Sequence, residues 1–502
     1  MKTEKLKQNV KGYVHQFEDG GLRLLRKGQK GVIHAIFSRF GLVLILLLLQ
    51  VGLLFSIFRW FGNLWPHYFG GSVVVTSAMV IYLLNSKMDN SAKITWMVVV
   101  AIAPVVGIPM FFYVKSNFGH NILRKRLLEL EDQLRGWLPQ SQKAVEQLKA
   151  LEPGAASLAK YLYGRGGGFP VYQNTAMTYF PGGEAKFEEL LRQLETAEEY
   201  IFVEYFIIDE GLMWGKILEV LARKALQGVD VRVMYDGTCE FSTLPRNYPR
   251  LLEKLNIQCK VFSPVQPFVS THYNYRDHRK ILVIDGRVGF TGGVNLADEY
   301  INHIQKHGRW KDAAVMLEGE AVRSLTAQFL QMWGILKEPE YEQFLTRPIP
   351  VPENAKGVAA PYGDCPLDGE RVGEMVYIDL LNRARDYIHI MTPYLILDGE
   401  LETALKFAAE RGVDVHLILP GNVENSLRVL DWIGENFAPG EVLVSLMRQY
   451  TPMGGLPAPF DRRVTDEEYD AVLSWMYLNE LEGFTQEAEA ADTGFIPDFL
   501  AD

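Results

Sequence analysis

Cysteine is scarce in this chain of 502 residues, which contains only Cys239, Cys259 and Cys365. Three cysteines cannot form a disulfide framework, and their spacing matches no zinc or iron–sulfur pattern. We therefore expect isolated thiols and predict no metal site built on cysteine.

Charged side chains are missing from three runs near the N-terminus. Residues 40–58 and 94–114 contain no Asp, Glu, Lys or Arg, and each reaches the roughly 20 residues that a helix needs to cross a bilayer core. The run 70–84 is shorter, but charge is absent from 60 to 86, so it can extend. A buried helix of a soluble domain fits the first run less well, because that run is apolar on all sides. The runs predict two or three transmembrane helices within 40–115, and hence a multi-pass protein of the cell membrane.

Basic residues lie on both sides of this region. The segment 1–39 is basic, and Lys115, Arg124, Lys125 and Arg126 follow the last run. Positive charge marks the cytoplasmic ends of membrane segments, so both flanks favour the cytoplasm. Both flanks can be cytoplasmic only if one of the three runs does not cross the membrane. The sequence therefore leaves open which membrane face holds the large domain.

A strand–helix–strand pattern occurs twice after residue 160. The first copy, residues 198–237, contains EEYIFVEYFIID, WGKILEVLARKALQG and VDVRVMYDG, and the second, residues 385–421, contains RDYIHIMTPYLILD, ELETALKFAAERG and VDVHLILPG. The joints QGVDVRV and RGVDVHL are nearly identical. We interpret the pattern as two copies of a βαβ-like unit in an α/β fold. The proline-rich segment 347–361 is typical of a linker between them.

His278 and Lys280 open an apolar strand in the string DHRKILVIDGRVGFTGGVN. Side chains alternate across a strand, so these two should face one way. Asp285 and the glycine after it predict a hairpin. Alone, a His-x-Lys pair is typical of a solvated strand edge and Asp-Gly of a simple turn, so the complete string carries the functional prediction.

Gly292 and Gly293 follow the return strand and precede Asn295. Adjacent glycines allow a backbone to approach a ligand closely. A lysine ammonium and an asparagine amide both donate to phosphate oxygens, and a neutral imidazole attacks phosphorus as a nucleophile. The spacing therefore suits phosphodiester chemistry without a metal.

The segments HRKILVID and RVGFTGGVN together resemble the HxKxxxxD signature of the phospholipase D superfamily. The N-terminal apolar runs, GVDVRVMYDG, the WKD of residues 310–312 and TPYLILDGEL are similar to bacterial cardiolipin synthases, over residues 30–421. The resemblance implies phospholipase D-like domains with mixed sheets behind the transmembrane helices. It also implies an enzyme that acts on membrane lipids, joins two phosphatidylglycerols, releases glycerol and needs no cofactor and no metal.

The resemblance also assigns roles. His278 would be the nucleophile that becomes phosphatidylated, and Asp285 would support the geometry of the histidine and the lysine. A second histidine of the family protonates the leaving alcohol. The phosphate would be bound by Lys280, Gly292, Gly293 and Asn295.

The second copy lacks this motif. A complete copy would place another His-x-Lys near residue 460, but Lys406 is the last lysine and His416 the last histidine. We predict a truncated second domain and impaired activity, because general acid–base help contributes about 10²–10⁴-fold. A homodimer would supply a second histidine. Three activities stay open: an impaired synthase, a phospholipase D-type hydrolase or nuclease, and an inactive membrane remnant.

The C-terminal segment differs in charge from the rest. Residues 421–502 hold sixteen acidic residues, four arginines and no lysine. VSLMRQYTPMG, VTDEEYDAVLSWMYLNELEGF and ADTGFIPDF resemble the C-terminal part of radical S-adenosylmethionine proteins related to pyruvate formate-lyase activating enzymes. Their CxxxCxxC motif is absent, so no such activity is implied, and we predict a fusion near residue 421.

The sequence thus predicts an α/β protein that binds no nucleic acid, since no basic surface interleaved with aromatics is present. The expected parts are a basic segment (1–39), a transmembrane region (40–115), a juxtamembrane helix (116–158), a first phospholipase D-like domain (159–346), a linker (347–361), a partial second domain (362–421) and an acidic fragment (422–502).

Overall fold

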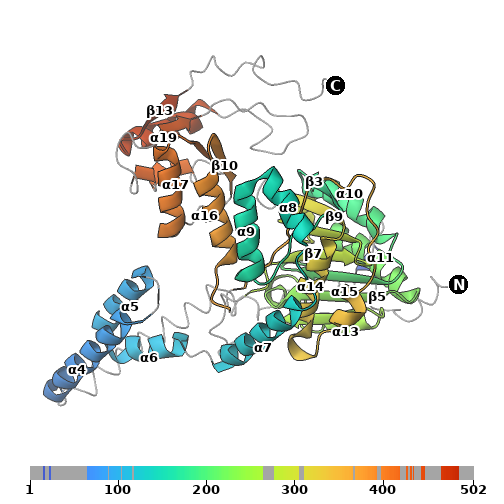
Figure 1. Ribbon diagram of the computed structural model, residues 1–502. Coiled ribbons are helices and arrows are strands. Elements are labelled where there is room, and N and C mark those ends of the chain that lie inside the picture. The colour runs from blue at the N-terminus through green and yellow to red at the C-terminus, as the bar shows by residue number, and fades with distance from the viewer. Residues whose placement is uncertain are drawn as a thin grey trace. The chain divides into compact units, whose positions relative to one another are not determined.

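The protein is described from a computed structural model (Figure 1). The structure describes residues 15–16, 22–23, 65–86, 88, 90–102, 104–115, 118–263, 276–304, 310–365, 368–392, 397–418, 426–427, 430–431, 433–434, 443–446 and 465–485. The apolar run 40–58 and the expected fusion point at residue 421 lie outside these residues.

Three helices follow one another near the N-terminus: α4 (Trp65–Leu84), α5 (Asn90–Ile102) and α6 (Pro104–Lys115). The stretch 94–114 is therefore divided between α5 and α6 and does not form one helix. Proline at the first position of α6 explains the division, because it lacks an N–H and disfavours helix in the residue before it. The three helices share a small core of Met79, Leu83, Val100 and Phe111.

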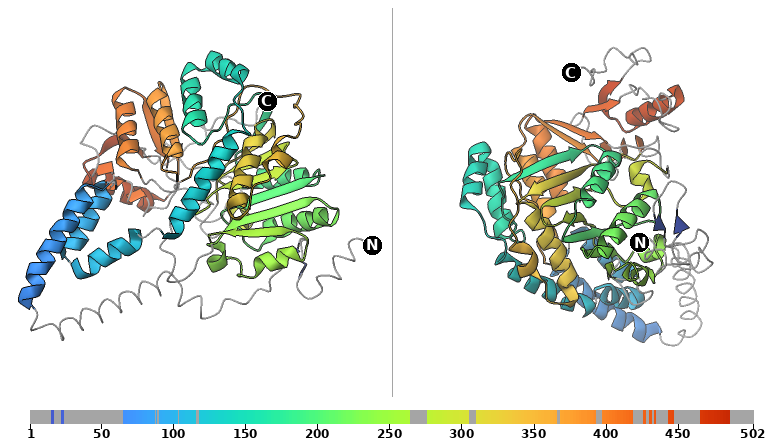
Figure 2. Two further views of the ribbon diagram at one scale, coloured as in Figure 1. Left: turned by 60° about the horizontal axis from the view of Figure 1, so that its bottom comes forward. Right: turned by 90° about the vertical axis from the view of Figure 1, so that its right-hand side faces the viewer.

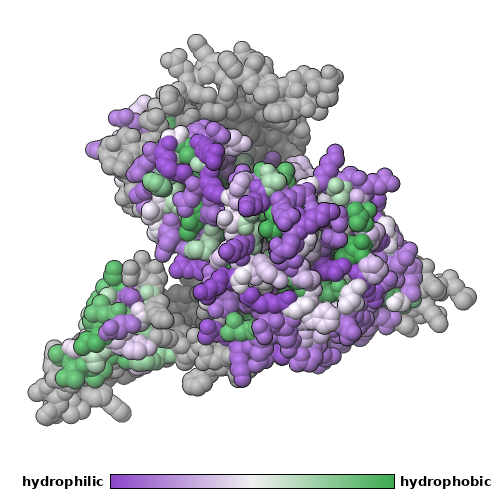
Figure 3. Space-filling view, in the orientation of Figure 1, coloured by the Kyte–Doolittle hydropathy of each residue, from purple (hydrophilic) through white to green (hydrophobic). Residues whose placement is uncertain are grey.

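The outer surface of these helices is also apolar (Figure 3). Within the described part of the chain, no helix has both the length and the apolar character needed to span a membrane. The large hydrophobic side chains exposed on α4, α5 and α6 are Val73, Val74, Val75, Ile81, Tyr82, Leu84, Ile94, Val98, Ile102, Met110 and Phe112.

The chain divides into two compact units. One contains the described residues of Met1–Leu130, Val203–Arg279 and Trp333–Pro339, and the other those of Glu131–Phe202, Lys280–Met332 and Glu340–Asp502.

A seven-stranded mixed sheet is the largest element of the fold, and its strands run side by side in Figure 2. The strand order is β3-β9-β8-β7-β4-β5-β6. Strands β3, β9, β8 and β7 pair antiparallel in that order, whereas β5 and β6 are parallel. The strand bounds are β3 (Thr175–Phe180), β4 (Tyr200–Tyr205), β5 (Asp230–Asp236), β6 (Gln258–Phe262), β7 (Lys280–Ile284), β8 (Val288–Gly292) and β9 (Ala314–Gly319).

Every residue of β4 and β7 is buried. Continuous burial explains why both strands are mostly apolar and do not alternate between apolar and polar residues; Glu204 in β4 and Lys280 at the start of β7 are the charged exceptions. Amphipathic helices of the first domain include α10 (Gly183–Leu194), α11 (Leu212–Leu226) and α14 (Val322–Trp333). Three helices precede the sheet in the chain: α7 (Phe118–Arg135), α8 (Gln142–Leu151) and α9 (Pro153–Gly164). The further helical segments of the first domain are α12 (Cys239–Ser242), α13 (Tyr248–Glu253), α15 (Tyr341–Leu345), η1 (Asp298–Ile301) and η2 (Gly334–Leu336).

The hairpin between β7 and β8 turns at Asp285 and Gly286, as the sequence predicts. Both residues have positive φ, 50° and 66°, which glycine adopts freely and aspartate tolerates in turns. The Asp285 carboxylate accepts hydrogen bonds from the backbone N–H groups of Glu198, Glu199 and Tyr200 at 2.8–2.9 Å. It therefore ties the hairpin to the start of β4.

The second copy of the repeat forms a smaller two-layer structure. Strands β10 (Tyr387–Met391) and β11 (Asp414–Ile418) pair in parallel, and α17 (Gly399–Glu410) connects them. This agrees with the predicted βαβ order. One face of the strand pair packs against α17 and α16 (Val372–Arg383), which lie beside β10 in Figure 1.

Part of the acidic C-terminal segment is also folded. Strands β12 (Leu443–Leu446) and β13 (Glu482–Thr485) pair in parallel, and α19 (Asp466–Leu478) precedes β13. The side chain of Thr465 and that of Glu468 form a reciprocal cap at the start of α19, an arrangement that satisfies two free N–H groups. Near the N-terminus, β1 (His15–Gln16) and β2 (Leu22–Arg23) pair antiparallel.

We predict that Asp285→Ala destabilises the fold by about 2–3 kcal/mol, because three backbone N–H groups lose a charged acceptor. Urea unfolding of the purified full chain, followed by circular dichroism, measures the change. Glu188→Gln, on an exposed position of α10, is the matched control and should leave the midpoint unchanged. Equal midpoints for Asp285→Ala and the wild type would show that the three hydrogen bonds do not hold the hairpin.

Candidate active site

Two lysines lie close together beneath the end of β8. Lys280 is the first residue of β7 and is 5% exposed, and Lys186 on α10 is 1% exposed. The Lys186 Nζ donates to the carbonyl of Val294 at 3.1 Å. Sequence reasoning identified Lys280 but missed Lys186, which is 94 residues earlier in the chain and belongs to no local motif.

Burial lowers the pKa of Lys186 to about 7. The positive charge of Lys280 lowers this pKa further, while the carboxylate of Asp312 opposes the change. A buried amine that titrates near neutral pH becomes fully charged when an anion arrives, since an opposite charge nearby favours its protonated form. Lys186 and Lys280 thus form a pair of buried amines beside the Asp312 carboxylate, called here the lysine pair.

Gly292, Gly293 and Asn295 lie close to Lys186, which donates to the carbonyl of Val294 between them. A Cβ at Gly293 would collide with the Asp312 carboxylate, and one at Gly292 would lie 2.5 Å from the carbonyl oxygen of Ala313. Glycine is therefore required at position 292 by the close backbone of residues 313–314, whereas a side chain at position 293 would displace the Asp312 carboxylate. Asn295 is 2% exposed, and its Nδ2 donates to the Tyr300 hydroxyl at 2.8 Å.

The segment with Trp310 and Asp312 is held by Asn302. The side chain of Asn302 accepts from the Trp310 N–H at 2.6 Å and donates to the Trp310 carbonyl at 2.9 Å. Trp310 also lies against Tyr300, with ring centroids 4.9 Å apart. These contacts hold the segment that contains Asp312, whose carboxylate raises the pKa of Lys186.

His278 lies two residues before β7 and is exposed to solvent. Its ring lies against Phe206, with centroids 4.6 Å apart and planes inclined by 53°. The Phe206 ring therefore covers part of the imidazole, while the residue as a whole is exposed.

The backbone on both sides of His278 is fixed by carboxylates. The N–H of Asp277 donates to Asp236 at 2.9 Å, and the N–H of Arg279 donates to the Asp277 side chain at 3.2 Å. Arg276 forms an ion pair with Asp236 at 3.5 Å. The exposed histidine is therefore presented from a rigid segment.

Glu204 and Asp277 form a buried acidic pair behind this segment. Burial raises the pKa of Glu204 well above its ordinary value, and the neighbouring Asp277 raises it further. Arg279, 3.8 Å from Glu204, opposes these effects. Burial also raises the pKa of Asp277. Burial and the closeness of the two carboxyl groups thus both favour the protonated form of Glu204, because two adjacent buried charges are costly.

The structure thus places the predicted residues in three surroundings. Lys280 forms the lysine pair with Lys186, and Gly292, Gly293 and Asn295 lie around Asp312 and Val294, which contact this pair. His278 lies in the segment fixed by Asp236 and Asp277. The described contacts of Asp285 are at the opposite end of β7, with the start of β4 and with Arg287 at 3.6 Å, so it acts on Lys280 only through the strand.

We predict that Lys186→Met removes a rise in stability between pH 7 and pH 9. The folded-state pKa of Lys186, about 7, lies below the ordinary 10.5, so the unfolded chain binds more protons in this window and stability rises with pH. Between pH 7 and pH 9, the free energy of unfolding should increase by about 2 kcal/mol more for the wild type than for the variant. Denaturant titrations at both pH values measure the difference, and parallel curves for the two proteins would contradict the titration of Lys186.

Known proteins share long parts of this sequence. The family model for the cardiolipin synthase phospholipase D-like domain matches residues 190–333 and 377–453. An uncharacterized protein of Streptococcus mutans is 54% identical over 68% of this chain and 74% of its own length. A cardiolipin synthase of Geobacillus kaustophilus is 34% identical over 69% of each chain.

Among solved structures, phosphatidylserine synthase of Haemophilus influenzae is similar with a TM-score of 0.38 and 13% identity, over 55% of this chain and 73% of that chain. The family match and the identity to cardiolipin synthases over two thirds of their length establish the relationship. The chain belongs to the cardiolipin synthase family of the phospholipase D superfamily.

Proposed function

We propose that this protein transfers a phosphatidyl group between lipids through His278. A ring nitrogen of His278 attacks the phosphorus of one phosphatidylglycerol, and the P–O bond to glycerol breaks as the P–N bond forms. Glycerol takes a proton and leaves. The hydroxyl of a second phosphatidylglycerol then attacks the same phosphorus, gives up its proton and breaks the P–N bond, which yields cardiolipin.

The observation that carries this proposal is the position of His278 itself. It is exposed although its neighbours Asp277 and Lys280 are 3% and 5% exposed. An exposed imidazole on a backbone fixed at both flanks has no evident role in packing the core. It can meet a substrate without rearrangement of the segment, which lowers the entropic cost of the attack.

The phosphate would be bound by Lys280, Lys186 and the amide of Asn295. Two ammonium groups neutralise the charge that develops on the phosphate oxygens as the imidazole attacks, and such preorganised charge is the main source of catalysis in many enzymes. In this proposal Gly292 and Gly293 bring the backbone to the phosphate. Asp285 positions β7 from its far end and touches no reacting atom.

The proton for the leaving glycerol requires a second group. The sequence holds no second His-x-Lys in its C-terminal half. We propose that a second copy of this chain provides its His278 as the acid, so that a homodimer contains one complete site. Without such a partner, the transfer would be slower by the roughly 10²–10⁴-fold that general acid–base help supplies.

We also propose that the region 40–115 anchors the protein in the cell membrane as a multi-pass segment. The support is the uncharged sequence of its runs and the apolar outer surface of α4, α5 and α6 (Figure 3). Membrane attachment would bring the site to substrates that are themselves lipids. The acidic segment 422–502 remains, in this proposal, a fragment of separate origin fused to a truncated second domain.

The covalent intermediate gives the first test. The purified full chain, mixed with phosphatidylglycerol labelled in the phosphate, should acquire label that is stable in alkali and released by acid, as expected for a P–N bond. His278→Ala should lose all label, whereas His303→Ala, an exposed histidine, should keep it. Label retained in His278→Ala would refute the nucleophile. Phosphatidic acid as the product in place of cardiolipin would identify a hydrolase, and no label or product from the wild type would identify an inactive protein.

Coexpression of differently tagged chains tests the dimer. With a ninefold excess of His278→Ala, most wild-type chains would be in mixed dimers that hold one histidine. The activity per wild-type chain should therefore fall several-fold, whereas the same excess of His303→Ala should leave it unchanged. Unchanged activity in mixtures that pull down both tags, or activity from a strictly monomeric preparation, would contradict a shared site.

A further inference from the structure

The strand pair β10–β11 has one covered face and one open face. Ile388 is 8% exposed and packs with Leu405 and Ala408 of α17. Alternation along the strands turns the intervening residues to the other side. There Tyr387 and Met391 are 64% and 56% exposed, so this face is open to solvent within the part of the chain that the structure describes.

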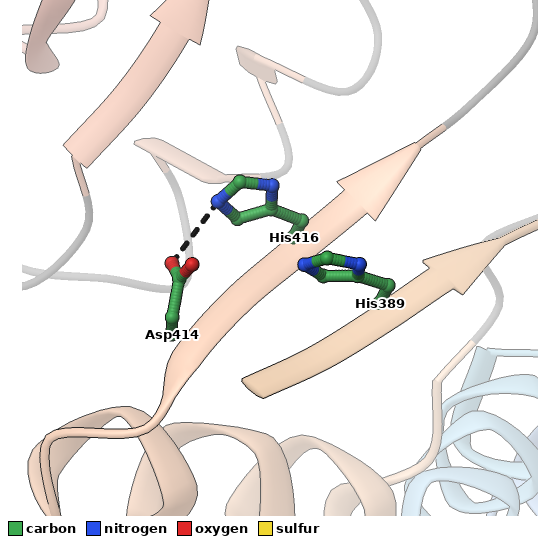
Figure 4. Close-up of side chains that lie close together, drawn as sticks. All are labelled: His389, Asp414 and His416. Atoms are coloured by element: carbon green, nitrogen blue, oxygen red, sulfur yellow. Dashed lines mark ion pairs between the residues drawn. The ribbon is translucent and has the colours of Figure 1, made fainter. Parts of the chain in front are cut away.

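Three side chains capable of binding a metal meet on the open face. His389 of β10 and His416 of β11 are directly paired in the parallel register, and their rings stack with centroids 4.8 Å apart. Asp414 precedes His416 by two residues, so it points to the same side, and its Oδ1 lies 3.0 Å from the His416 Nε2. Figure 4 shows the carboxylate beside the His416 ring, with the His389 ring on the neighbouring strand.

The first copy of the repeat has different residues at two of these three positions. Aligning YIFVEY with YIHIMT pairs Phe202 with His389, and aligning VDVRV with VDVHL pairs Arg232 with His416. Phe202 stacks on Phe329 at 4.4 Å, and Arg232 forms an ion pair with Asp230 at 2.7 Å. Neither phenylalanine nor arginine binds metal ions.

The residue at the third position is an aspartate in both copies. Asp414 corresponds to Asp230, so the second copy retains the carboxylate and replaces its two neighbours by imidazoles. The side chains of Asp414 and His416 are 63% and 54% exposed, whereas Arg232 is 6% exposed. The second copy has therefore exchanged a buried ion pair and an aromatic contact for an accessible group of ligands.

We propose that His389, Asp414 and His416 bind a divalent transition metal ion, represented by Zn²⁺, independently of the phosphatidyl transfer. Two imidazole nitrogens and one carboxylate oxygen are a ligand set that zinc, nickel and copper favour, whereas magnesium and calcium prefer oxygen ligands. Water would complete the coordination on the exposed side.

The distances are compatible with such a site. One ligand atom from each of the three residues lies within 4.8 Å of the other two. Zinc bonds of about 2.0–2.2 Å in a tetrahedral arrangement place ligand atoms roughly 3.4 Å apart. Side-chain rotation alone closes the remaining gap, because the rings and the carboxylate are exposed and the strands already hold their Cα atoms in register.

Metal binding would replace the ion pair between Asp414 and His416 by bonds that link β10 to β11. Such a link acts on the strand pair of the second copy and not on the residues proposed for catalysis. Its measurable effect is therefore metal affinity and stability, because a ligand that binds only the folded state raises that state's stability.

Calorimetric titration of the full chain with zinc chloride, after removal of metal by a chelator, tests the proposal. We expect one high-affinity equivalent, with His389→Gln, His416→Gln and Asp414→Asn each weakening binding roughly tenfold or more. His303→Gln, an exposed histidine outside the group, is the control and should bind zinc as the wild type does. Magnesium chloride in place of zinc chloride should give no heat of binding.

Electron paramagnetic resonance of the wild type with one equivalent of Cu²⁺ provides a measurement that does not depend on the folding of variants. Splitting by two nitrogen ligands would support the site. The absence of zinc binding by the wild type, unchanged affinity in the His389→Gln/His416→Gln double variant with native circular dichroism, or a copper spectrum without nitrogen ligands would each overturn it.

Discussion

The complete burial of β7 is the constraint on which the candidate site depends. All five residues of this strand are buried, so groups that must meet solvent or substrate can lie only at its ends. His278 precedes the strand and is exposed, Lys280 begins it and is buried in the lysine pair, and Asp285 follows it at the hairpin. The His-x-Lys sequence therefore marks the point where the chain passes from the surface into the core. The opposite end is held by three backbone hydrogen bonds to one carboxylate.

Local patterns in the sequence were sufficient for the elements that depend on neighbours in the chain. The turn at Asp285 and Gly286 was predicted because few residues adopt positive φ there, and the βαβ order was predicted from two similar joints. The single helix expected over 94–114 was wrong at Pro104, whose effect on helix continuity outweighs the apolar composition. Alternation could not assign a face to His278 and Lys280, because a strand buried on both sides has no polar face and the histidine lies outside it.

Residues brought together by the sheet were not accessible to sequence reasoning. Lys186 lies close to Lys280 because the tertiary structure brings α10 and β7 together. No sequence motif relates the two residues. His389 and His416 are 27 residues apart and become neighbours through the register of two parallel strands. The acidic pair of Glu204 and Asp277 likewise joins β4 to the segment before β7. In each case the missing information was the pairing of strands or the docking of a helix, which depends on the whole domain.

The low pKa of Lys186 has a consequence for the proton balance of the proposed reaction. Near neutral pH this amine is only partly protonated, since a buried charge beside Lys280 is costly. In the proposed reaction, a phosphodiester anion bound by the lysine pair would draw a proton from the medium onto Lys186, and departure of the lipid would return it. Binding of the substrate would thus be accompanied by proton uptake, and its release by proton release. Buffer molecules at the membrane surface would supply and accept these protons during lipid exchange.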